Sequence, residues 1–292
     1  MIHGSLVAIV TPFNNGKIDE QALINLIEFQ IENGTHGIVP CGTTGESPTL
    51  SHEEHEHVIE LTVKTVNKRV PVIAGTGSNS TKEAIRLTRF AEQAGSDAAL
   101  LVVPYYNKPT QEGLYLHFKN IAAHVDIPLI LYNIPGRAGV NMAPETVARL
   151  ASECKNIVGV KEASGSIPQA SKIIHLCGED FIVLSGEDAL NFPLMAVGAK
   201  GFITVTANVM PADVAALYDT FINGEFEKAR DLHYKLLPLN EALFIETNPI
   251  PVKAALSMMD KIKYEYRYPL CEMSPEHFEE LKDVVSGYGL IG

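Results

Sequence analysis

The sequence predicts a (β/α)8 barrel followed by a C-terminal helical region. Three observations lead to this fold class: short apolar segments recur eight times, amphipathic stretches separate them, and each unit is roughly 25–30 residues long. The chain has 292 residues, 46% of them hydrophobic, which is enough for one large domain or two smaller ones. The eightfold alternation favours a closed barrel over an open sheet.

The eight apolar segments are expected to be parallel strands. Each is apolar almost throughout, as is typical of strands covered on both faces, and none alternates between polar and apolar residues. The expected strands are residues 6–10, 37–40, 71–75, 98–103, 128–132, 157–161, 181–185 and 201–205.

Amphipathic stretches between these segments are expected to be helices. Residues 19–34 and 81–95 both end at a glycine, which fits a helix C-cap. The eighth helix, within residues 211–224, is expected to end near Gly224. Residues 225–244, 248–259 and 274–289 are helical in pattern with no further strand, so we expect a catalytic barrel at 1–224 and a C-terminal helical region at 225–292.

Composition excludes several classes of function. A net charge of −12 and a pI near 5.3 argue against nucleic acid or an anionic membrane as the partner. The N-terminus lacks a basic region, and no apolar run is long enough to span a bilayer. The cysteines are scattered without a CxxC pair, which is typical of reduced thiols in a cytoplasmic protein; they are Cys41, Cys154, Cys177 and Cys271.

Candidate chemistry gathers at the carboxyl ends of the strands, which form the reactive face of such a barrel. Lys161 ends the apolar run "IVGVK" and precedes a turn rich in Gly and Ser. A buried ammonium is costly, so a lysine there can lose its proton and become a nucleophile toward carbonyl compounds. The alternative is a lysine whose stem packs at the barrel rim while its charge reaches water.

Other polar residues at the same face could assist such a lysine. Tyr132 ends the neighbouring strand and could move the protons that imine formation requires, or could simply be a core aromatic residue. Thr43 and Thr44, in "GTTGE", could present hydroxyl and N–H groups to a carboxylate, or form a plain glycine turn. Tyr106 could relay protons or pack, and Arg137 could clamp a carboxylate or lie on the surface.

Two stretches resemble binding motifs without matching them. "GTTGES" lacks the GK[ST] of a phosphate loop, and "GTGSNS" lacks the third glycine of a dinucleotide fingerprint. "HEEHEH" at residues 52–57 departs from HExxH, and no third ligand has suitable spacing. We therefore expect no nucleotide and no metal, and interpret 52–57 as a solvated helix start.

Taken together, six motifs resemble the dihydrodipicolinate synthase family, one of the pyruvate-dependent class I aldolases, a group that also includes N-acetylneuraminate lyase. The motifs extend nearly from end to end of the chain: "GSLVAIVTPF", "CGTTGES", "PYYNKPTQEGLYLHF", "YNIPGRAGVNM", "IVGVKEASG" and "NPIPVKAAL". The resemblance implies a lyase of lysine and diaminopimelate biosynthesis that condenses pyruvate with L-aspartate 4-semialdehyde to 4-hydroxy-tetrahydrodipicolinate. It implies no metal and no organic cofactor.

The resemblance also implies a role for each site residue. Lys161 would form the imine with pyruvate, and Tyr132 would donate and accept protons through a relay with Thr43 and Tyr106. Tyr106 would reach into a neighbouring subunit's site, which makes a dimer the minimal active unit and a homotetramer the usual assembly. Pyruvate would be held by Thr44 and by the backbone at Gly186 and Ile203, and the carboxylate of the semialdehyde by Arg137.

Inhibition by L-lysine is a further implication. The positions that match the effector site of inhibited members are Pro48, His52, His55, Gly77, Asn79, Glu83 and Tyr105. Glu83 would bind the ammonium of the effector. Pro48 replaces a smaller alanine of some inhibited members, which matters only if that contact runs through the side chain.

Two alternatives differ in function. N-acetylneuraminate lyase would share Lys161, Tyr132 and the carboxylate site, but Arg137 together with Thr43 and Tyr106 favours the synthase. A non-catalytic sensor of 2-oxo acids would keep the carboxylate turn without needing the lysine, the tyrosine and the relay together.

Overall fold

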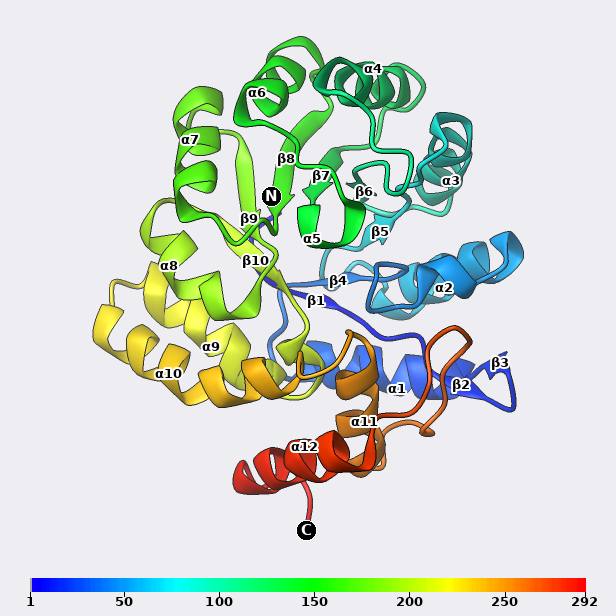
Figure 1. Ribbon diagram of the computed structural model, residues 1–292, viewed down its shortest axis with the longest axis vertical. Helices are drawn as coiled ribbons and strands as arrows, with labels where there is room; N and C mark the ends of the chain where they lie inside the picture. The colour runs from blue at the N-terminus through cyan, green and yellow to red at the C-terminus, as the bar shows by residue number, and fades with distance from the viewer. Residues whose placement is uncertain (1) are drawn as a thin grey trace.

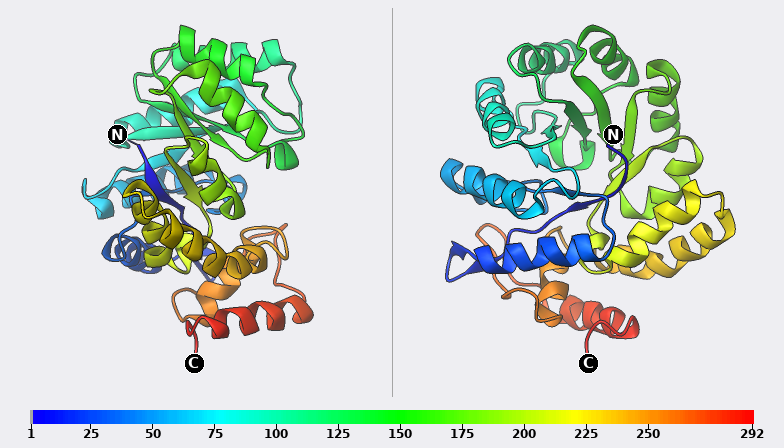
Figure 2. Two further views of the ribbon diagram at one scale, coloured as in Figure 1. Left: turned by 90° about the vertical axis from the view of Figure 1, so that its left-hand side faces the viewer. Right: turned by 180° about the vertical axis from the view of Figure 1, so that it is seen from behind.

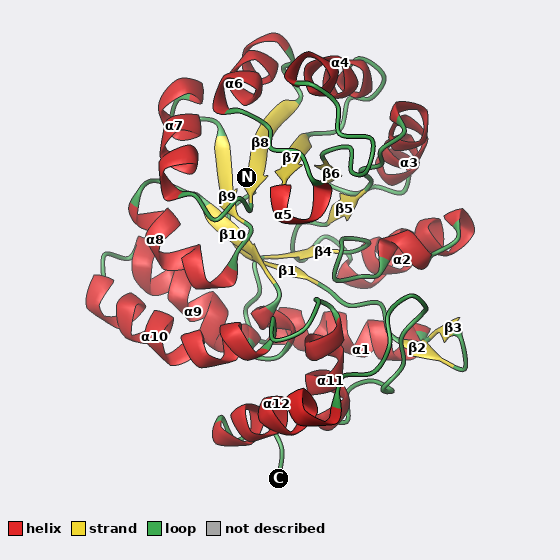
Figure 3. Ribbon diagram, viewed as in Figure 1, coloured by secondary structure: helices red, strands yellow, loops and turns green. Residues whose placement is uncertain are grey.

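The computed structural model describes residues 2–292, which form a closed barrel of parallel strands surrounded by helices (Figures 1 and 3). Within these residues, eight strands pair in the order β4-β1-β10-β9-β8-β7-β6-β5, and a parallel bridge between Ile38 and Val72 joins the two edges. The strands are β1 (Gly4–Ala8), β4 (Gly37–Val39), β5 (Ile73–Gly75), β6 (Ala98–Val102), β7 (Leu129–Asn133), β8 (Ile157–Glu162), β9 (Ile182–Ser185) and β10 (Gly201–Thr204). The predicted (β/α)8 barrel is confirmed.

Strand β1 begins earlier than the sequence pattern suggests. The expected segment was 6–10, whereas Gly4 and Ser5 already pair with Gly201 and Phe202 of β10. A Cβ atom on Gly201 would lie 2.3 Å from the carbonyl oxygen of Gly4, so only glycine permits this close pairing. Hydrophobicity could not reveal the shift, because Gly4 and Ser5 are not apolar.

The helices that cover the barrel follow the strands in chain order. They are α1 (Glu20–Glu32), α2 (His52–Val66), α3 (Thr81–Gln93), α4 (Gln111–Ala122), α6 (Pro144–Glu153), α7 (Ile167–Cys177), α8 (Asn191–Ala196) and α9 (Pro211–Ile222). Gly34 and Gly95 follow α1 and α3 with φ angles of 82° and 87°, which confirms the predicted glycine caps. Between β7 and α6 lies the short helix α5 (Pro135–Ala138), which carries Arg137.

The C-terminal helices are α10 (Phe226–Ala242), α11 (Ile250–Met258) and α12 (Pro275–Gly287). Figures 1 and 2 show α11 and α12 at the end of the molecule where α1 lies, opposite α4 and α6. A small hairpin of β2 (Phe13–Asn14) and β3 (Lys17–Ile18) lies beyond the end of β1. One hydrophobic cluster joins these helices to the barrel and contains Leu26, Val214, Leu239, Leu256 and Leu281. The C-terminal region therefore shares a core with one side of the barrel. No helix within residues 2–292 is long and apolar enough to cross a membrane.

Candidate active site

Lys161 and Tyr132 face each other at the carboxyl ends of neighbouring strands. The two residues are register partners in the pairing of β7 with β8, and the Nζ atom of Lys161 lies 4.4 Å from the centroid of the Tyr132 ring. Both side chains are buried, with 7% and 6% of their surfaces exposed. Because adjacent parallel strands bring residues of equal register together, the sequence could predict this pair once the strands were correctly placed.

The environment of Lys161 shifts its protonation equilibrium toward the neutral amine. Burial lowers its pKa to about 8, the carboxylate of Asp188 opposes this effect, and the guanidinium of Arg137 adds to it. Asp188 is itself held by the backbone N–H groups of Val205 and Thr206, each at 2.9 Å. Asp188 was not among the predicted site residues, although it lies in "SGED" directly after a predicted strand.

Tyr132 is a protonated phenol at neutral pH. Burial raises its pKa to about 12, while Arg137 and a hydrogen bond with the Thr43 side chain lower it. A phenol of this kind can donate a proton, but it needs a partner to recover one. Thr43 lies close enough to be that partner.

The turn that carries Thr43 and Thr44 is a tightly bonded loop. The N–H of Glu46 donates to the carbonyl of Thr43 at 3.1 Å, and Glu46 adopts a left-handed backbone with φ 52°. The Thr44 hydroxyl is buried and accepts a hydrogen bond from the Nδ2 of Asn248 at 3.0 Å. The backbone carbonyl oxygen of Asn248 accepts a hydrogen bond from the guanidinium of Arg137, also at 3.0 Å.

Asn248 was not among the predicted site residues. It begins "NPIPVKAAL", a motif of the C-terminal region that contributes to the family resemblance. A polar residue at the start of an apolar helix was the available signal. Only the packing of the C-terminal region against the barrel brings it between Thr44 and Arg137.

Gly186 directly follows β9, and Ile203 lies near the end of β10. A Cβ atom on Gly186 would lie 2.9 Å from Cε of Lys161, so the glycine leaves room for the lysine stem. Ile203 is fully buried in a hydrophobic cluster inside the barrel that also contains Tyr132. Gly186 therefore lies against the lysine, and Ile203 shares the barrel interior with Tyr132.

A cavity of about 360 Å3 opens beside Tyr132. Thr43, Tyr132 and Arg137 line it, together with Gly75 and Leu100 from the neighbouring strands. The same cavity reaches most of the predicted effector residues: Pro48, His52, His55, Gly77, Glu83 and Tyr105. The remaining one, Asn79, donates through Nδ2 to the carbonyl of Tyr105 at 3.2 Å.

Tyr106 is the predicted site residue that a single chain does not bring to the site. Its side chain is 89% exposed, and its backbone has a φ angle of 71°, a conformation that non-glycine residues seldom adopt. It lies in the loop after β6 and is not among the residues that line the cavity beside Tyr132.

The histidines of "HEEHEH" have separate partners. The Nε2 of His52 lies 2.9 Å from Glu83, that of His57 lies 2.9 Å from Glu20, and that of His55 lies 2.8 Å from the carbonyl of Gly75. Residues 2–292 contain no group of three or more His, Cys, Asp or Glu arranged to hold a metal ion. The expectation of a solvated helix start is wrong for His55, which is buried because it packs over β5.

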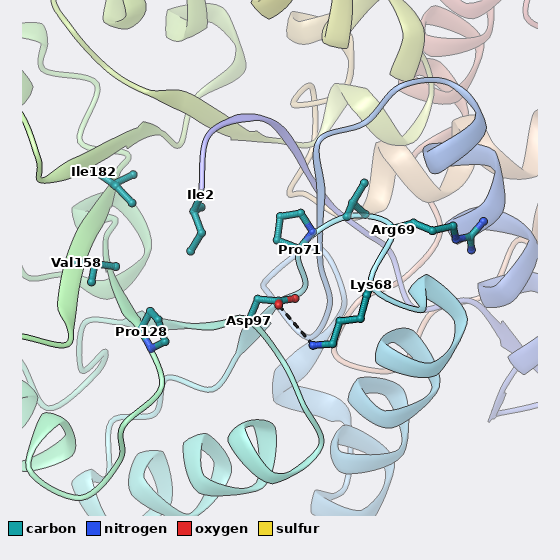
Figure 4. Close-up of a pocket in the computed structure, with 9 residues that line it drawn as sticks. Ile2, Lys68, Arg69, Pro71, Asp97, Pro128, Val158 and Ile182 are labelled. Carbon is teal, nitrogen blue, oxygen red and sulfur yellow. Dashed lines mark hydrogen bonds and ion pairs between the residues drawn. The ribbon is translucent and has the colours of Figure 1, made fainter.

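A second cavity, of about 490 Å3, lies at the opposite end of the barrel (Figure 4). Ile2, Pro128, Val158 and Ile182 line it, with an ion pair of 3.5 Å between Lys68 and Asp97. These residues precede or begin their strands, so the cavity is at the amino-terminal end, where barrels seldom carry catalytic residues. The larger cavity is therefore not the candidate site.

The comparison with protein families agrees with this geometry. The profile described as "Dihydrodipicolinate synthetase family" matches residues 1–287. The chain belongs to the dihydrodipicolinate synthetase family. The resemblance drawn from the six sequence motifs is thereby confirmed.

Curated relatives within this family are named 4-hydroxy-tetrahydrodipicolinate synthase. The one from Thermodesulfovibrio yellowstonii is 64% identical and the one from Syntrophus aciditrophicus 62% identical, each match covering 100% of both chains. The crystal structure of dihydrodipicolinate synthase from Aquifex aeolicus is 54% identical, with a TM-score of 0.98 and 99% of each chain covered. These findings confirm the predicted synthase and favour it over N-acetylneuraminate lyase.

Three other solved synthases of this family are described by a bound molecule or by their assembly. The enzyme from Acinetobacter baumannii, 48% identical with a TM-score of 0.97 over 100% of both chains, is complexed with pyruvate and described as chloride inhibited. The enzyme from Cyanidioschyzon merolae, 39% identical with a TM-score of 0.96 over 99% of both chains, has lysine bound. A further relative, 45% identical with a TM-score of 0.97 over 99% of this chain and 97% of its own, is described as a monomeric variant.

Proposed function

We propose that this synthase condenses pyruvate with L-aspartate 4-semialdehyde through an imine on Lys161. The observation that carries the proposal is the buried Lys161 amine beside the Tyr132 phenol, with its pKa lowered to about 8. The neutral amine attacks C2 of pyruvate, and loss of water gives the imine. The imine accepts electrons when a proton leaves the methyl carbon, and the resulting enamine attacks the aldehyde of the second substrate.

Each remaining residue has a part in this reaction. Tyr132 supplies and removes protons during imine formation, with Thr43 as its relay partner. Thr44, with the backbone at Gly186 and Ile203, holds the pyruvate carboxylate. Arg137 binds the carboxylate of the semialdehyde, for which its planar guanidinium is suited. The amine of the condensed product then displaces Lys161 from the imine, which closes the ring and frees the enzyme.

Borohydride trapping tests the proposal. Reduction in the presence of pyruvate should give one covalent adduct, which peptide mass spectrometry maps to Lys161. The adduct should be absent from Lys161→Met and unchanged in the matched control Lys200→Met, whose side chain is exposed. An adduct that persists in Lys161→Met would overturn the assignment.

We propose that Tyr106 completes the relay of a neighbouring subunit, so that a dimer is the minimal active unit and a pair of dimers the usual assembly. The exposure of Tyr106 and its unusual backbone conformation support this role. Co-expression of Lys161→Met with Tyr106→Phe tests it, because only a mixed dimer then contains one intact site. We expect about one quarter of the wild-type turnover from random pairing. Turnover no higher than that of either variant alone would show that Tyr106 acts within its own subunit.

We propose L-lysine as an inhibitor that binds the outer part of the cavity. His52 and Glu83 lie 2.9 Å apart there, and the Glu83 carboxylate can bind the effector's ammonium. Millimolar L-lysine should slow the wild-type enzyme and the exposed control Glu60→Gln, but not Glu83→Gln. Equal inhibition of both variants would count against this site. The cytoplasmic location expected from the scattered cysteines stays a prediction.

A further inference from the structure

A charged pair with no access to solvent joins the C-terminal region to the turn that carries Thr43 and Thr44. Lys253 on α11 forms an ion pair with Glu46, the residue that ends the "GTTGE" turn, and both side chains are 0% exposed. The Nζ of Lys253 also donates to the carbonyl of Thr11 at 3.1 Å and lies 4.3 Å from the ring centroid of Phe13. Glu46 accepts a second bond from the backbone N–H of Arg267 at 3.2 Å.

Stability alone does not account for such a pair. Taking two charges out of water costs several kcal/mol per ion, and apolar residues of equal volume often stabilise a protein as well or better. The lowered pKa of Lys253 reflects this burial, which the Glu46 carboxylate opposes. An ion pair with hydrogen-bond geometry also fixes the relative position of its two groups.

The group that Lys253 positions is the turn carrying Thr43 and Thr44. Glu46 follows Thr44 by two residues, and its left-handed backbone is a conformation that the surroundings must hold in place. The Thr11 hydroxyl donates to the carbonyl of Gly45 at 2.7 Å, and Lys253 bonds the carbonyl of the same Thr11. Lys253 therefore holds the turn directly through Glu46 and indirectly through Thr11.

Two neighbours on the C-terminal chain extend this connection. Asn248 bonds the Thr44 hydroxyl on one side and Arg137 on the other, each at 3.0 Å. Arg267 binds Glu54, near the start of α2, through both terminal nitrogens, and its Nη1 donates to the carbonyl of Thr49 at 3.0 Å. The loop from β4 to α2 is thus held by the C-terminal chain along its length.

We propose that Lys253 is a positioning residue of the catalytic site, which acts through its buried ion pair with Glu46 to hold the Thr43–Thr44 turn. The inference rests on the proposed function, since it assigns the turn a part in proton transfer and in pyruvate binding. Loss of the pair leaves Lys161 able to form its imine. The same loss of the ion pair moves Thr43 away from Tyr132 and Thr44 away from the substrate carboxylate. A displacement of about 1 Å is enough to lower turnover roughly a hundredfold.

The test compares three variants. Lys253→Met leaves Glu46 buried without its cation and is expected to lower the Tm. The double variant Lys253→Met with Glu46→Gln contains no unpaired buried charge, so its Tm should return toward that of the wild type. Lys282→Met is the matched control, because its partner Glu279 lies on the same exposed face of α12; it should change neither Tm nor turnover.

Turnover in the double variant separates positioning from stability. Active sites are counted by borohydride trapping at saturating pyruvate, and kcat is expressed per trapped site. We expect a kcat reduced by roughly tenfold or more and half-saturation at a higher pyruvate concentration, although the protein is stable. A double variant with a wild-type kcat per site would overturn the proposal.

Hydrogen exchange gives a readout that does not depend on catalysis. The amides of residues 45–47, which bond to carbonyls of residues 42–43, should exchange faster in the double variant than in the wild type. Wild-type exchange there would also refute the proposal. If the wild-type enzyme lacked synthase activity, the proposed function would fail, while the exchange measurement would still decide whether Lys253 holds the turn.

Discussion

The titration of Lys161 gives the most direct physical test of the proposed site. Burial lowers its pKa from 10.5 to about 8. At pH 7 an amine with a pKa of about 8 is neutral in about one molecule in ten, whereas an ordinary lysine is neutral in about one in three thousand. The environment therefore multiplies the reactive fraction by roughly 300, which corresponds to about 3 kcal/mol.

The protonation state that reacts decides how the rate of adduct formation at Lys161 depends on pH. Because only the neutral amine attacks pyruvate, the rate of adduct formation should rise with pH and level off above the pKa. We expect the midpoint of the wild-type profile near pH 8. Rates of reductive trapping with cyanoborohydride, followed by intact mass and normalised to a small-molecule amine in the same buffers, measure it.

Two variants should shift this midpoint in opposite directions. Asp188→Asn removes the carboxylate that raises the pKa of Lys161, so its midpoint should move to lower pH. Arg137→Gln removes a cation that lowers the same pKa, so its midpoint should move to higher pH. A wild-type midpoint above pH 10, or shifts of the same sign in both variants, would refute the reasoning.

Three further substitutions test single contacts. Tyr132→Phe should keep the pyruvate adduct and lower kcat by roughly 10²-fold or more, because the proton donor is lost, and near-normal turnover in a steady-state assay would remove Tyr132 from its role. Gly186→Ala places a Cβ atom 2.7 Å from that of Ala163 and 2.9 Å from Cε of Lys161, so trapping should slow and unfolding should become easier by about 1–3 kcal/mol. The control Gly287→Ala, with nothing within 4 Å, should be silent in both trapping and denaturant titration. Arg137→Lys keeps the charge without the planar fork, so KM for the semialdehyde should rise more than KM for pyruvate, and equal increases would contradict the assigned contact.

The fold could be predicted from the sequence because its signals are local. Near-continuous apolar strands, amphipathic helices and glycine caps such as Gly34 and Gly95 each depend on a few neighbouring residues. Strand boundaries were less certain, as β1 illustrates, because pairing of Gly4 with Gly201 is a contact between chain segments far apart. The motifs likewise identified the family, since they record residue types and spacings directly.

The sequence by itself determined the barrel, the family and the pair of Lys161 with Tyr132, because equal register on adjacent parallel strands brings their ends together. Only the tertiary structure decided how the site is supported. Asn248, Lys253 and Arg267 reach the loop between β4 and α2 from a region that the pattern identifies merely as helical. No periodicity records which helix packs on which loop, and the burial of Glu46 and Lys253 depends on every element around them. Long-range packing converts two ordinary charged residues into a single buried pair.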